Sequence, residues 1–111
     1  MEVVPDRGEI WWVAPDPTLG SELRKTRPCV VVSVKVLNER RRTVVVVPLS
    51  SSPKASPPIL IPITCDGRQV VAVSDQIRAV AKERLRSRIG VVADEELAQL
   101  EDGLRQILQL G

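Results

Sequence analysis

Two stretches of this sequence carry side chains that could act on a phosphate ester, and each adjoins an apolar run. The stretch 15–33, PDPTLGSELRKTRPCVVVS, places Arg24, Lys25 and Arg27 directly before β-branched residues. The stretch Ser50–Pro58, SSSPKASPP, places hydroxyls and a lysine directly after another apolar run. Guanidinium groups match the geometry of phosphate, and hydroxyls can donate to phosphoryl oxygens. The pattern indicates contact with phosphodiesters, although a solvated basic loop beside a strand would leave the same pattern.

Arg27 is the best placed of these cations. Pro28 follows it and favours extended backbone at Arg27, at the start of a predicted strand. If that strand pairs antiparallel with the strand that ends at Leu49, Arg27 and Ser50 emerge at the same edge of the sheet. We therefore expect a cation and a run of hydroxyls to lie together.

Composition narrows the classes of function. The chain has 111 residues, enough for a single domain over 1–111 with its own core. It contains no histidine, which excludes Cys-His and Ser-His-Asp catalysis, most zinc sites and two-histidine ribonuclease chemistry. Trp11 and Trp12 are its only aromatic residues, too few for an aromatic RNA-binding platform. The net charge of +2 means that any nucleic-acid site must be a local basic patch.

The location of the protein is predicted from what the sequence lacks. No apolar run approaches the ~18 residues of a membrane span, and the N-terminus has no long apolar stretch typical of a signal peptide. We therefore expect a cytoplasmic protein. Cys29 and Cys65 are far apart and form no CxxC motif, so we expect no disulfide, and Cys29, which sits in an apolar run, should be a buried free thiol.

Hydrophobic periodicity predicts a β-rich chain. Gly8–Ala14 is the first predicted strand, and alternation puts Trp11 and Trp12 on opposite faces, one in the core and one toward solvent, a partner or a ligand. The other predicted elements are strand Pro28–Val36, a turn at Asn38–Arg42, strand Thr43–Leu49, strand Ile59–Ile63, a turn at Asp66–Gly67, strand Gln69–Ser74, a strand passing into a short helical turn within 74–85, and strand Ile89–Val92. We expect the second and third strands to form a hairpin.

The pattern changes to a helical period at Asp94. The apolar positions on one face of this predicted helix are Leu97, Leu100, Leu104, Ile107 and Leu108. Gly103 weakens the helix by ~1 kcal/mol relative to Ala, which suggests that it serves close packing. The predicted fold is mainly β with a C-terminal helix: a small, strongly bent barrel of about six strands.

Five blocks of the chain, in order and covering nearly all of it, resemble the MazF/PemK family of toxin endoribonucleases. These blocks are RGEIWWV, DPTLGSELRKTRPCVVVS, VVVVPLSSS, SDQIRAV and RLRSRIGVVADEEL. The resemblance implies an SH3-like, CcdB/PemK-type barrel that forms a homodimer. It implies cleavage of single-stranded RNA, usually mRNA, at short motifs without a metal or other cofactor, leaving a 2′,3′-cyclic phosphate and a 5′-hydroxyl. It also implies a MazE-like antitoxin whose C-terminal segment lies over the RNA site.

The resemblance also assigns residues. The catalytic Arg of the family falls on Arg27 and its catalytic Thr on Ser50, which keeps the hydroxyl but loses the methyl that fixes the rotamer. Some relatives have an Arg where this chain has Val73, which puts an Arg–Asp acid–base pair in doubt. The general base is unassigned: Glu22 and Asp75 are candidates, and either could instead orient the substrate or stabilise the fold. The expected substrate-binding residues are Thr18, Glu22, Lys25, Ser51, Lys54, Asp75, Gln76 and Arg78.

Two other functions remain open at this point. A CcdB-like gyrase inhibitor would share the barrel without the nuclease chemistry, but such toxins resemble one another in a Trp close to the C-terminus, and this chain ends Leu-Gln-Leu-Gly. A non-catalytic SH3-like binding module is the second alternative, and Ser50 in place of Thr is the one feature that hints at it.

Overall fold

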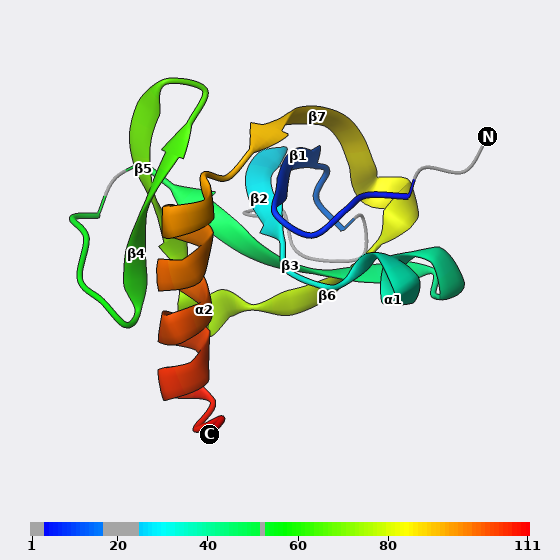
Figure 1. The fold of residues 1–111 in the computed structure, drawn as a ribbon. Helices are drawn as coiled ribbons and strands as arrows, with labels where there is room; N and C mark the ends of the chain where they lie inside the picture. The colour runs from blue at the N-terminus through cyan, green and yellow to red at the C-terminus, as the bar shows by residue number, and fades with distance from the viewer. Residues whose placement is uncertain (1–3, 17–24, 52) are drawn as a thin grey trace.

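The computed structural model of the chain describes residues 4–16, 25–51 and 53–111, and its main feature is a strongly bent antiparallel sheet of seven strands (Figure 1). The strand order is β4-β5-β3-β2-β1-β7, and β6 pairs with β3 off this path. The strands are β1 (Glu9–Val13), β2 (Arg27–Val31), β3 (Thr43–Ser50), β4 (Leu60–Cys65), β5 (Arg68–Val73), β6 (Arg78–Ala81) and β7 (Leu85–Val91).

β3 is the central strand of the sheet, because it pairs with three others, β2, β5 and β6. Its first half pairs with β6, with Val44 opposite Val80, and its last residues, Leu49 and Ser50, pair with β5. β2 runs along β3 from Cys29 opposite Pro48 onward. The end of β3 therefore lies where the two parts of the sheet meet, and Ser50 is its last residue (Figure 1).

The C-terminal helix α2 (Asp94–Ile107) packs beside β4, as its apolar stripe predicts (Figure 1). Leu100 is fully buried in the core on that side. The backbone N–H and the hydroxyl of Thr64 both donate to the carboxylate of Glu96, at 2.9 Å each, and attach the start of the helix to the sheet. Gly103 lies against the chain after β3, where an added Cβ would come within 2.8 Å of the Pro58 carbonyl oxygen. The prediction that Gly103 permits close packing is therefore confirmed.

Side chains of β2 alternate between two hydrophobic clusters. Val30 points into the cluster covered by α2, whereas Cys29 and Val31 point into a second cluster. All three side chains are fully buried. β2 is thus fixed on both faces, and so is the position from which Arg27 projects at its first residue.

The structure corrects the prediction for the second strand and the turn after it. The strand predicted at Pro28–Val36 is shorter in the structure: β2 ends at Val31, five residues before the predicted end. A short helix, α1 (Lys35–Arg40), includes most of the turn predicted at Asn38–Arg42. β2 and β3 are therefore not a hairpin, although they pair antiparallel as predicted.

A buried polar contact explains this helix. Asn38 is fully buried, and its side-chain amide donates to the carbonyl oxygens of Pro5, at 2.9 Å, and Ser33, at 3.0 Å. Nζ of Lys82 donates to the backbone carbonyl of Asn38 at 2.7 Å. Ser33 is a local partner, but Pro5 and Lys82 lie 33 and 44 residues from Asn38, so most of the contact around this helical turn leaves no local signal.

Other predictions agree with the structure. The Asp66–Gly67 turn joins β4 and β5, with φ of 52° and 78° at its two residues. Residues 74–84 form the 3₁₀ turn η2 (Ser74–Gln76), strand β6 and the 3₁₀ turn η3 (Lys82–Arg84). Trp11 packs against the core, whereas Trp12 is 40% exposed. The last strand, predicted at Ile89–Val92, begins earlier, at Leu85, where it pairs with β1.

No helix among residues 4–16, 25–51 and 53–111 is long and apolar enough to cross a membrane.

Candidate RNA-cleavage site

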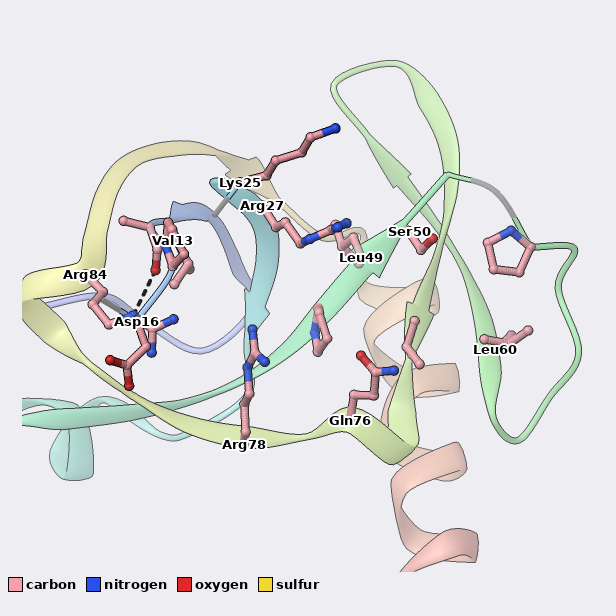
Figure 2. A pocket seen from close by; sticks show the side chains of 15 residues that line it. Val13, Asp16, Lys25, Arg27, Leu49, Ser50, Leu60, Gln76, Arg78 and Arg84 are labelled. Atoms are coloured by element: carbon pink, nitrogen blue, oxygen red, sulfur yellow. Dashed lines mark hydrogen bonds between the residues drawn. The ribbon is translucent and has the colours of Figure 1, made fainter. Parts of the chain in front are cut away.

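Arg27 and Ser50 lie at the same end of the β2–β3 pair and line one cavity. The β2–β3 register pairs Cys29 with Pro48, and continuing it by two residues places the first residue of β2 opposite the last residue of β3. Arg27 also pairs with Val13 of β1, so the start of β2 is held from that side. The predicted meeting of a cation and a hydroxyl at one edge is confirmed, and Figure 2 shows both side chains at the same cavity.

That cavity has a volume of about 390 Å³ and is predominantly cationic. Of the charged side chains that the structure describes along its wall, four are positive and one, Asp16, is negative. The chain brings them from distant segments (Figure 2). The predicted site residues that line it are Lys25, Arg27, Ser50, Gln76 and Arg78.

A second cavity, of about 500 Å³, adjoins the first. Lys25, Arg27 and Ser50 line both cavities, so they stand on the boundary between them. Ser51, another predicted site residue, lines only the second cavity, together with Trp12 and other residues. A linear polymer that occupied both cavities would pass Arg27 and Ser50 partway along its length.

The positive charges that line the first cavity also affect the pKa of a buried thiol, that of Cys29. Burial raises the pKa of the Cys29 thiol to about 11, and the positive charges of Arg78, Arg84 and Arg27 partly oppose that rise. Three guanidinium groups therefore lie close enough to Cys29 to act on it. Cys29 is buried and free, as predicted, and its thiol is protonated near neutral pH; Cys65 is buried and free as well.

Several predicted residues do not join this cluster. Lys54 and Asp75 are exposed, and the structure does not place them along either cavity. Gln76, the neighbour of Asp75, does line the first cavity. Thr18 and Glu22 lie outside the described residues, so their assignments stay predictions.

Sequence reasoning missed Arg84. Arg84 is the last residue of η3. Its Nε donates to the carbonyl oxygen of Ala14 at 2.8 Å, and the backbone N–H of Ala14 donates to the backbone carbonyl of Arg84 at 2.8 Å. The only local signal was a cation shortly after the strand that carries Arg78. Nothing local indicates that this cation folds back on a residue 70 positions earlier.

Comparisons with known proteins agree with this geometry. A profile of the family described as PemK-like, MazF-like toxin of type II toxin-antitoxin system matches residues 6–108. The chain is 42% identical to the endoribonuclease MazF9 of Mycobacterium tuberculosis over 94% of this chain and 96% of the relative. It is 37% identical to the endoribonuclease toxin MazF of Escherichia coli K12 over 85% of each chain.

Solved structures share the fold. The structure of MazF from Deinococcus radiodurans superposes with a TM-score of 0.82 at 23% identity, covering 98% of this chain and 100% of that one. An endoribonuclease from a mycobacterial species, solved in complex with its cognate antitoxin, gives a TM-score of 0.79 at 21% identity, covering 96% and 97% of the two chains. The predicted fold class, a mainly β CcdB/PemK-type barrel with a C-terminal helix, is confirmed.

Proposed function

This chain belongs to the PemK-like, MazF-like toxins of type II toxin–antitoxin systems, and on that premise we propose that it is an endoribonuclease that cleaves single-stranded mRNA at short sequence motifs. The observation that carries the proposal is that Arg27 and Ser50, at the same end of the paired strands β2 and β3, lie on the wall of one cationic cavity. The 37% and 42% identical relatives are named endoribonucleases, which favours this function over gyrase inhibition or a non-catalytic binding module.

The proposed reaction is an internal transfer at phosphorus. The ribose 2′-oxygen attacks the adjacent phosphorus and forms a P–O2′ bond while the P–O5′ bond breaks. The 2′-hydroxyl proton goes to a general base that is not assigned, and the 5′-oxygen takes a proton from water or from a general acid that is likewise not assigned. The products are a 2′,3′-cyclic phosphate and a 5′-hydroxyl.

The chain contributes mainly charge stabilisation to this reaction. Negative charge grows on the phosphoryl oxygens as the 2′-oxygen attacks, and preorganised donors aimed at those oxygens lower the barrier. Arg27 supplies a fixed positive fork, since an arginine side chain remains charged, and Ser50 supplies a hydroxyl donor. We assign Arg27 to charge stabilisation rather than to proton transfer. With Lys25 and Arg78 also at the phosphate, no metal ion is needed in the proposed mechanism.

The proposal includes partners. We propose that the protein acts as a homodimer in the cytoplasm, where its mRNA substrate is found, and that a cognate MazE-like antitoxin covers the RNA site. One structural neighbour was solved with its cognate antitoxin, and that likeness supports the antitoxin part of the proposal.

The decisive experiment is cleavage of a long single-stranded RNA by the purified protein in EDTA, with the ends of the products mapped. Discrete cuts that leave 5′-hydroxyl ends, ready for labelling by a kinase without phosphatase treatment, would support the proposed chemistry and identify the recognition motif. The Arg27→Ala variant, purified in parallel, controls for contaminating ribonuclease. An intact RNA with a folded protein would contradict the proposal, and inhibition of DNA supercoiling would then favour the gyrase alternative.

A further inference from the structure

The cavity beside Arg27 and Ser50 extends to an arginine for which the proposed reaction has no role. Figure 2 shows Arg84 at one side of the cavity and Ser50 at the other, with Arg27 and Arg78 between them. We propose that Arg84 binds a second phosphodiester of the RNA, on a nucleotide next to the scissile one, and so sets how the substrate lies across the site. This inference rests on the proposed RNA substrate.

The guanidinium of Arg84 is held in place before any substrate binds. Its Nε donates to the Ala14 carbonyl at 2.8 Å, and the backbones of the two residues are joined by a second hydrogen bond of 2.8 Å (Figure 2). Within the described part of the chain, Nη1 and Nη2 of Arg84 make no hydrogen bond or ion pair. A guanidinium fixed through Nε still presents two amino groups, which is the fork that a phosphate accepts.

The charge of the first cavity as a whole favours an anion. Arg84 shares the cavity with Lys25, Arg27 and Arg78, and Asp16 is the single carboxylate among the described lining residues. Arg27 and Arg84 also each oppose the rise that burial causes in the pKa of the Cys29 thiol, which agrees with their place on one cavity wall. An RNA strand carries one phosphate per nucleotide, so a strand with its scissile phosphate at Arg27 would carry the next phosphate along the same cationic wall.

Two roles for Arg84 can be separated by substitution. If it only ties η3 to Ala14, a neutral donor would suffice, and Arg84→Gln retains an N–H for the Ala14 carbonyl. If it binds phosphate, the positive charge is what counts, and Arg84→Lys retains it. Arg86 provides the matched control: it is exposed, its Nη1 donates to the Glu83 carbonyl at 2.8 Å, and it is absent from the described walls of both cavities.

The test is the salt dependence of RNA binding. The probe is a fluorescent single-stranded RNA that contains the mapped cleavage motif, with 2′-deoxyribose at the cleaved nucleotide so that it binds without being cut. At low salt, we expect the dissociation constant of Arg84→Gln for this RNA to be at least roughly tenfold higher than that of the parent protein. We also expect it to lower the slope of log K against log salt concentration by ~0.7, the contribution of one phosphate contact to a single strand. Arg84→Lys and Arg86→Gln should keep the slope of the parent protein.

A wild-type slope in a folded Arg84→Gln protein would overturn the inference. An equal loss of slope in Arg84→Lys and Arg84→Gln would overturn it as well, because the retained charge would then have no effect. A second measurement needs no variant: RNAs with one phosphate at a time replaced by neutral methylphosphonate should lose affinity at the scissile position and at one neighbouring position. Loss at the scissile position alone would contradict a second phosphate site. Failure of the parent protein to bind or cleave RNA would instead contradict the proposed function.

Discussion

Arg27 and Ser50 are 23 residues apart in the sequence but line the same cavity, each two residues beyond the last β2–β3 pair, Cys29–Pro48, as the first residue of one strand and the last of the other. Each residue is held in the sheet by a neighbouring strand, Arg27 by Val13 of β1 and Ser50 by Val71 of β5. Groups that stabilise charge at a reacting phosphate need that kind of preorganisation. The mutational predictions for catalysis follow from this placement.

Replacing Arg27 by Ala should lower the single-turnover rate of RNA cleavage by ~10²–10³ or more, the effect typical of removing one preorganised charge-stabilising donor. Arg27→Lys should recover only part of the rate, because an ammonium lacks the planar fork. Arg27 is exposed at the start of its strand, so both variants should unfold at the temperature of the parent protein. A rate near that of the parent in Arg27→Ala would remove Arg27 from the mechanism.

Ser50→Thr should keep or raise the cleavage rate. Threonine has the same hydroxyl and adds a methyl group that restricts its rotamers, so the donor spends more time in one orientation. Ser50→Ala should be slower than the parent by ~10²–10³, since the donor is lost. Both rates would be measured on the mapped motif under single-turnover conditions. An inactive but folded Ser50→Thr protein would indicate that this edge of the sheet serves another purpose.

The Arg27–Ser50 pair could be predicted because both residues flank long apolar runs, and antiparallel pairing of those runs was enough to bring them together. The amphipathic period of α2 and the Asp66–Gly67 turn are equally local signals. The helix α1 could not be predicted, because it depends on the contact of Asn38 with Pro5, 33 residues away. Arg84 was missed for the same reason, since its place in the cavity depends on Ala14.

The buried thiol of Cys29 should make the folded protein less stable at high pH. Burial raises its pKa from 9.0 to about 11, so the folded state holds this proton more tightly than the unfolded chain does. Below pH 9 the thiol is protonated in both states and its contribution is complete. Between pH 9 and 11 only the unfolded chain releases the proton, and the free energy of unfolding should fall by on the order of 2–3 kcal/mol.

The measurement is urea unfolding of the parent and of Cys29→Ala from pH 8 to 11, within the range in which both remain folded. Lysines and other ionisable groups are the same in both proteins, so their effect cancels in the difference. Cys29→Ala should be less stable at pH 8 because it leaves a cavity, and its disadvantage should shrink as the pH rises. Two parallel curves would show that the thiol does not titrate with the expected shift.

Gly103→Ala should destabilise the protein even though alanine favours helices. The substitution gains ~1 kcal/mol of helix propensity. The new Cβ, however, would lie 2.8 Å from the Pro58 carbonyl oxygen and 3.0 Å from Cδ1 of Ile61, and a backbone atom cannot yield as a flexible side chain can. Overpacking of this kind costs ~1–3 kcal/mol, so with the propensity gain subtracted we expect a net loss of up to ~2 kcal/mol in urea unfolding. Gly90→Ala is the control, because a Cβ there meets no atom within 4 Å. It should change the free energy of unfolding by less than ~0.5 kcal/mol.

A more stable Gly103→Ala protein would mean that α2 does not pack closely against the chain at Pro58.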